Sequence, residues 1–187
     1  MTAESTETRR GWRDRYVMYG ALLVSWVAMV GSLYFSEVRH FVPCQLCWYQ
    51  RYLMYPLALG ILPLGLLTRD EKVPYYSAFF AGIGMLVSAY HYLVQKTTLF
   101  LSGSVCAGGV PCNVAYINWF DFITIPFLAL IAFILIFIAS VIAITTREPL
   151  WAHDEDERAP WLPVLGIIAL VVALFASSFL GNQPAPA

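Results

Sequence analysis

The chain has 187 residues, of which 59% are apolar and only 12% carry a charge, and its formal net charge is −1. The apolar residues fall into long uninterrupted blocks, which excludes an ordinary soluble domain and is typical of an integral membrane protein. The near-neutral charge, without a basic stripe, gives no support to a nucleic-acid partner.

Five apolar stretches reach the length of about 20 residues that an α-helix needs to cross a bilayer. In chain order they cover residues 16–36, 46–67, 73–95, 122–145 and 161–180. A β-barrel would instead show alternating segments of about 10 residues. We therefore expect an all-α membrane protein, with a four-helix transmembrane bundle in residues 16–145 and a fifth, C-terminal transmembrane helix.

The basic residues predict the orientation, because short cytoplasmic loops carry an excess of Lys and Arg. Eight of them lie on one side of the expected spans: Arg9, Arg10, Arg13, Arg15, Arg69, Lys72, Arg147 and Arg158. The N-terminus is therefore expected in the cytoplasm. The first span follows a basic region, as a signal peptide would, but it is longer than a typical signal core and no small-residue cleavage site follows. We expect it to be retained.

The connections between the spans are short, and they leave no room for a separate soluble domain. We expect residues 1–15 to form a cytoplasmic tail and residues 146–160 a cytoplasmic loop. Residues 161–187 should form the extra helix and an extracytoplasmic tail. Pro56 and Pro63 lie inside the second span and should bend it.

The four cysteines form two pairs outside the apolar segments, an inner pair (Cys44 and Cys47) and a loop pair (Cys106 and Cys112). On the outer side of a bacterial membrane, two structural disulfides are the simplest interpretation, and a four-cysteine zinc site is another. A disulfide that closes so short a loop contributes only about 2 kcal/mol, and the C-x5-C spacing is unusual for zinc. Short exposed disulfides exchange readily, so redox exchange is favoured.

The inner pair stands at the start of a predicted helix. Pro43 precedes the pair and the apolar run begins at Leu46, so Cys47 should lie in the first helical turn. The helix dipole there favours a thiolate, and Arg51, one turn further, adds a positive charge. This predicts a nucleophile of low pKa at Cys47. An arginine just inside a membrane segment usually has a polar or anionic partner, although snorkelling to the interface is the alternative.

His91 is the only histidine inside an apolar block. It lies about one turn below the outer end of the third span, at a depth similar to that of Arg51, so both side chains are candidates for one outer-leaflet pocket. A hydrogen-bonded packing role for His91 is the alternative. The loop pair lies in a different environment from the inner pair, because Gly108, Gly109 and Pro111 predict a tight, mobile turn between its two cysteines. We expect such a turn to let the loop pair reach a partner protein.

Two stretches carry a family resemblance. The run CQLCWYQR at 44–51 resembles the C-x-L-C-x-x-Q-R signature of the disulfide bond formation protein B family, DsbB. The runs VPC at 110–112, YINW at 116–119 and ITIPF at 123–127 resemble the short-loop branch of that family, often called BdbC. The resemblance covers roughly residues 16–145, and the fifth span exceeds the four-helix core of the family.

The resemblance implies a quinone-dependent thiol oxidase, a monomer in a bacterial plasma (inner) membrane that binds no metal. A thioredoxin-fold partner of the DsbA or BdbD type would attack the loop pair at Cys106. The loop pair would pass two electrons from Cys112 to Cys44, and Cys47 would deliver them to menaquinone or ubiquinone. The implied catalytic residues are Cys44, Cys47, Cys106 and Cys112, and the implied quinone-binding residues are Arg51 and His91.

Two other functions are compatible with thiols at a membrane surface. A vitamin K epoxide reductase-like enzyme also couples quinones to thiols in a four-helix bundle, but its C-x-x-C pair lies late in the chain, whereas Cys44 and Cys47 begin the second span. A membrane scaffold with passive disulfides is the non-enzymatic alternative. It predicts that all four cysteines stay oxidised whatever reduced partner is supplied.

Overall fold

The computed structural model describes residues 3–97, 111–113, 115–145 and 161–181, and this part of the chain is helical apart from its connections. The elements are α1 (Ala3–Leu33) with a π-helical end η1 (Tyr34–Val38), α2 (Gln45–Tyr55), a π-helical stretch η2 (Pro56–Ile61), α3 (Leu62–Leu67), α4 (Val73–Lys96), α5 (Ile125–Thr145) and α6 (Trp161–Gly181). Because η1 continues α1 and η2 joins α2 to α3, these elements make five helical segments.

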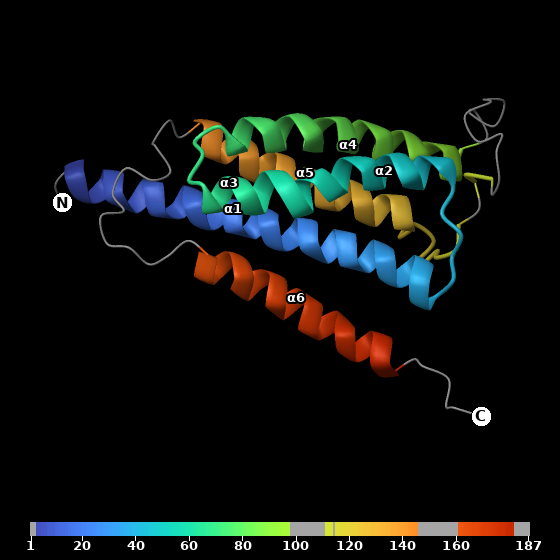
Figure 1. Ribbon diagram of the computed structural model, residues 1–187. Helices are drawn as coiled ribbons and strands as arrows, with labels where there is room; N and C mark the ends of the chain where they lie inside the picture. The colour runs from blue at the N-terminus through green and yellow to red at the C-terminus, as the bar shows by residue number, and fades with distance from the viewer. Residues whose placement is uncertain (1–2, 98–110, 114, 146–160, 182–187) are drawn as a thin grey trace.

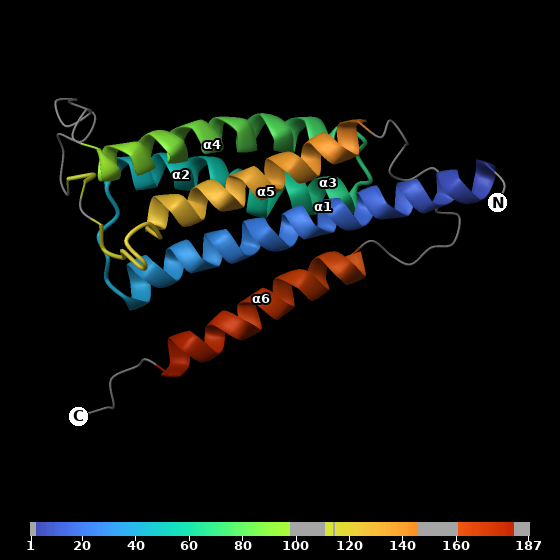
Figure 2. The same cartoon turned by 180° about the vertical axis from the view of Figure 1, so that it is seen from behind.

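The segments run back and forth. Figure 1 shows α1, α4 and α6 pointing in one direction, and α2–α3 and α5 in the other. The view from behind shows α5 between α4 and α1, with α6 beside α1 on the side away from α4 (Figure 2). Within the part of the chain that the structure describes, three helices are long and apolar enough to cross a membrane: Tyr16–Val38, Val73–Lys96 and Ile125–Thr145. The apolar part of α6, Trp161–Ser177, is shorter.

The second predicted span is interrupted rather than simply bent. Regular α-helix ends at Tyr55, and the wider π-helical stretch begins at Pro56. Proline has no N–H to donate to the preceding turn, so the regular hydrogen-bond ladder is lost there. Pro63 causes no second break, because it lies in the first turn of α3, where its missing N–H is not needed. The chain still continues in one direction from Gln45 to Leu67.

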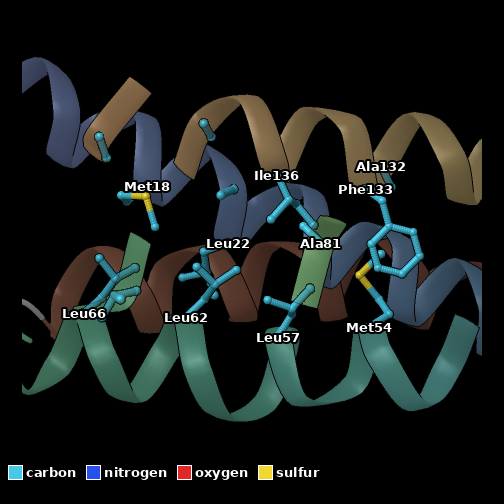
Figure 3. Close-up of a cluster of buried hydrophobic side chains, with 14 of the residues drawn as sticks. Met18, Leu22, Met54, Leu57, Leu62, Leu66, Ala81, Ala132, Phe133 and Ile136 are labelled. Carbon is cyan, nitrogen blue, oxygen red and sulfur yellow. The ribbon is translucent and has the colours of Figure 1, made fainter. Parts of the chain in front are cut away.

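The core lies between α1, α2–α3, α4 and α5. Figure 3 shows side chains from all four segments pointing into one cluster, which contains Met18, Leu22, Met54, Leu57, Leu62, Leu66, Ala81, Ala132, Phe133 and Ile136. A buried hydrogen bond of 2.6 Å between Ser77 and Ser140 links α4 to α5 within the same region. This packing fixes α2 against α1 and α4, and so it determines where the inner cysteine pair lies.

The contact between α4 and α5 depends on a glycine. A Cβ atom added to Gly84 would collide with the ring of Phe133, which is fully buried. We expect Gly84→Ala to lower the free energy of unfolding in detergent by about 1–3 kcal/mol, because overpacking displaces side chains and backbone. The midpoint of unfolding in mixed micelles measures this.

Gly82→Ala is the matched control for this prediction. It lies on the same helix and gains the same helix propensity, but the nearest atom to its added Cβ would be Phe137 Cε2 at 3.5 Å, an ordinary contact. Equal unfolding midpoints for the two variants would contradict the packing argument.

Candidate functional site

The inner pair stands where an extended segment turns into α2. Cys44 has extended backbone angles (φ −71°, ψ 172°) and caps the helix that begins at Gln45. Its carbonyl accepts the first helical hydrogen bond, from the N–H of Trp48 at 3.2 Å. Cys47 therefore lies in the first turn, and this prediction from the sequence is confirmed.

Cys44 and Cys47 are both free thiols, and their sulfur atoms lie 3.2 Å apart within hydrogen-bond reach. Cys44 is buried and Cys47 is half-buried. A separation of 3.2 Å is longer than the S–S bond of about 2.05 Å, yet it allows a disulfide to form with small side-chain movements. The geometry of the pair is therefore compatible with a dithiol and with a disulfide.

His91 lies behind Cys44 and is fully buried on α4. Its Nε2 is 3.5 Å from Cys44 Sγ, and its Nδ1 is 3.1 Å from the amide nitrogen of Gln50. With that nitrogen donating to Nδ1, the imidazole carries its proton on Nε2 and donates it toward the sulfur of Cys44. The histidine is thus a satisfied buried residue, and its hydrogen bond acts on the inner pair.

The pKa of Cys44 is shifted by its neighbours. The hydrogen bond between Cys44 and Cys47 lowers the pKa of the Cys44 thiol to about 4, against the raising effect of burial, and the hydrogen bond with His91 also lowers it. The sequence argument assigned the thiolate to Cys47. In the structure His91, 47 residues away in the chain, contacts Cys44, and a contact over this separation has no local signal in the sequence.

Arg51 joins the start of α2 to the end of α1. Its Nε donates to Ser32 Oγ at 2.9 Å and one terminal nitrogen donates to the Ser32 carbonyl at 3.0 Å. The guanidinium carbon also lies 5.2 Å from the ring centroid of Trp48, which is a cation–π contact. Arg51 is buried within the protein. Among the described residues its partners are neutral, and no carboxylate neutralises its charge.

A cavity of about 710 Å³ opens beside the inner pair, between α1, α2 and α5. Its wall includes Cys44, Cys47, Gln50 and Arg51, while most of the other lining side chains are apolar. Volumes of this size are typical of sites for small organic molecules. His91 is not among the lining residues, so the structure places it next to Cys44 but not on the cavity wall.

Aromatic side chains form the outer rim of this cavity. Phe41 stacks on Tyr116 with ring centroids 4.8 Å apart, and on Phe35 at 6.1 Å. Tyr116 is positioned by a tight turn that Lys96 holds at the end of α4, through a hydrogen bond of 3.0 Å to Asn118 Oδ1. The segment before α5 therefore folds back over the site.

Cys112 is disulfide-bonded and only 2% exposed. It packs in one apolar cluster with Cys44, Leu46 and Val94. The four-cysteine zinc site is therefore wrong, because a sulfur in a disulfide is not available as a thiolate ligand. The inner pair is free in the structure, so a disulfide is present only at Cys112 among the described cysteines. Cys106, like the predicted mobile turn, lies outside the described residues.

Sequence reasoning missed two residues of this site. Ser32 receives both hydrogen bonds from Arg51, and its one signal in the sequence is that it is a polar residue near the outer end of an apolar span. Gln50 belongs to the motif at 44–51, but nothing local indicates that its amide orients His91. Both contacts join residues far apart in the chain.

Comparisons with known proteins agree on one family. Residues 14–144 match the family described as "Disulfide bond formation protein DsbB". The chain is 53% identical over 131 residues to the probable disulfide formation protein C of Halalkalibacterium halodurans, a match that covers 70% of this chain and 95% of that protein. It is 56% identical over 121 residues to the disulfide bond formation protein C of Bacillus subtilis, covering 65% and 87% respectively. No solved structure matches the chain.

Proposed function

The chain belongs to the DsbB family of disulfide bond formation proteins, and from this membership we propose that it is a quinone-dependent thiol oxidase that reoxidises a thioredoxin-fold partner. One observation carries the proposal: the free inner pair lies on the wall of an apolar cavity that also contains the buried guanidinium of Arg51. A vitamin K epoxide reductase-like enzyme is disfavoured, because the C-x-x-C pair begins the second helical segment and the family match is to DsbB.

The proposed setting is a bacterial plasma membrane that the chain crosses five times, with a core of residues 16–145 and α6 as the last crossing. The alternating directions of the five segments support this arrangement (Figure 1). The excess of Lys and Arg on one side supports a cytoplasmic N-terminus. Both cysteine pairs then face the outside, where a soluble partner of the DsbA or BdbD type meets them, and the chain acts as a monomer.

The proposed electron path has two exchanges before the acceptor. The two thiols of the partner reduce a disulfide between Cys112 and Cys106, and the partner leaves as a disulfide. The resulting loop dithiol reduces a disulfide of the inner pair through Cys112 and Cys44, which restores the loop disulfide. The two sulfur atoms of the inner pair lie 3.2 Å apart, a geometry that supports the disulfide required by this exchange.

The cavity residues fit a lipid-soluble quinone, menaquinone or ubiquinone. When bound, the quinone accepts two electrons and two protons and leaves as the quinol. Arg51 would donate hydrogen bonds to a ring oxygen, since its charge has no carboxylate partner among the described residues. Cys47 would face the ring from the cavity wall. His91 lies off that wall, and we assign it to stabilising Cys44 as a thiolate.

The purified protein in detergent tests this function, with a reduced thioredoxin-fold protein and excess quinone. We expect quinone absorbance to fall over many turnovers, with one quinone reduced for each partner disulfide formed. Omitting the thioredoxin-fold protein should leave the quinone unchanged. A passive scaffold would give no turnover in the complete mixture, and that result would disprove the proposal.

A further inference from the structure

The helix α6 lies outside the region that matches the family, since the match ends at residue 144 and α6 begins at Trp161. The 131 matched residues make up 95% of the Halalkalibacterium relative. That protein is therefore too short to hold both the family region and a further helix of this length. The fifth helix is therefore an addition in this chain, and the electron path described above assigns it no role.

One stripe of α6 packs against the bundle. Val164, Ile168, Val171 and Phe175 recur at spacings of three and four residues, which places them on one helix face. Val164 and Val171 are almost fully buried, and they join the hydrophobic clusters of the bundle. The other faces are largely exposed. Figure 2 shows α6 beside the C-terminal part of α1, on the side away from α4.

At the outer end of this stripe, α6 reaches the cavity. Phe175 and Tyr34 form an edge-to-face pair with ring centroids 6.4 Å apart. Both side chains line the cavity, and Phe175 is the one lining residue that α6 contributes within the described part of the chain. The added helix thus forms part of the wall of the same cavity that holds the inner pair.

The cavity is longer than a quinone ring alone requires. Its lining runs from Tyr34 in η1 to Leu23 in α1, and from Ile125 to Leu135 along α5. At about 1.5 Å per residue, each of these paths is roughly 15 Å long. The polar groups lie near Cys47 and Arg51, whereas the lining residues further along α1 and α5 are apolar. The shape therefore fits a polar head with a long apolar tail.

We propose that Phe175 of α6 forms part of a binding site for the isoprenoid tail of the quinone, so that the fifth helix selects quinones by their tail. This inference rests on the proposed function. The apolar groove between α1 and α5 would hold the first isoprene units, and Phe175 would bound it beside Tyr34. Burial of an aromatic ring against apolar chain atoms supplies the affinity.

The test compares two quinones with the same ring, a naphthoquinone without a tail and one with four isoprene units. In Phe175→Ala we expect the KM for the tailed quinone to rise roughly fivefold. The KM for the tail-less quinone should stay within twofold, and kcat should be unchanged for both. Phe175→Leu, which keeps an apolar side chain, should restore most of the affinity and guards against a folding defect.

Leu174→Ala is the matched control, because Leu174 is the adjacent residue on α6, is 62% exposed and does not line the cavity. It should change neither KM. Equal KM changes for the two quinones in Phe175→Ala, or no change, would overturn the tail site while leaving the proposed function intact. Failure of the parent protein to reduce either quinone would overturn both, so the two failures are distinguishable.

Discussion

Replacing Cys47 by serine should abolish catalytic quinone reduction, with a loss of at least roughly a thousandfold in turnover. A serine hydroxyl has nearly the same size and can still hydrogen-bond to Cys44, 3.2 Å away in the parent. It cannot form a disulfide, so the inner pair can neither accept nor release two electrons. Quinone absorbance in the presence of the reduced thioredoxin-fold protein measures the loss.

The same variant should still oxidise its partner once. The loop pair is untouched, and Cys112 is disulfide-bonded in the structure, so each chain should convert about one equivalent of partner dithiol and then stop. Gln45→Ser is the matched control, because Gln45 is exposed and lies between the two cysteines; its turnover should equal that of the parent. Multiple turnover by Cys47→Ser would disprove the electron path.

Replacing Arg51 by alanine should raise the KM for quinone about tenfold or more, while the single exchange with the partner protein keeps its rate. A hydrogen bond from a charged donor contributes about 1.5–3 kcal/mol, which corresponds to roughly a tenfold to hundredfold change in affinity. The two steps are separated by measuring steady-state KM for quinone and single-turnover oxidation of the partner.

Arg51 also ties α2 to α1 through Ser32, so a structural effect needs its own control. Ser32→Ala removes the hydroxyl acceptor but keeps Arg51 and its bond to the Ser32 carbonyl. Its KM for quinone should stay within about threefold of the parent value. If Ser32→Ala matched Arg51→Ala, or if Arg51→Ala slowed partner exchange more than it raised the quinone KM, Arg51 would not be a quinone contact.

Much of the fold followed from local patterns in the sequence. The apolar runs located the helical segments, and Pro43 with the run from Leu46 placed Cys47 in a first turn, as observed. The break at Pro56 was also predictable, because a missing N–H is a local property. The absence of a second break at Pro63 was not predictable from the sequence. It depends on the π-helical stretch that ends at Ile61, just before α3 begins.

The contacts that define the site were not predictable in the same way. Arg51 meets Ser32 across 19 residues, and Gln50 meets His91 across 41. Such pairs depend on how the helices are rotated about their axes, and spans that are apolar on every face give no local signal of that rotation. For this reason the sequence placed Arg51 and His91 in one pocket, whereas the structure puts only Arg51 on the cavity wall.

The burial of Cys112 beside Cys44 has a consequence for how oxidising power is conserved. Cys112 is 2% exposed and shares an apolar cluster with Cys44, Leu46 and Val94. Small hydrophilic thiols such as glutathione are poorly soluble in such surroundings, so they have little access to the sulfur atoms of Cys44 and Cys112. In the proposed electron path, this burial would slow reduction of the sulfur atoms by small thiols, so that exchange would occur mainly with a protein partner that fits the loop pair.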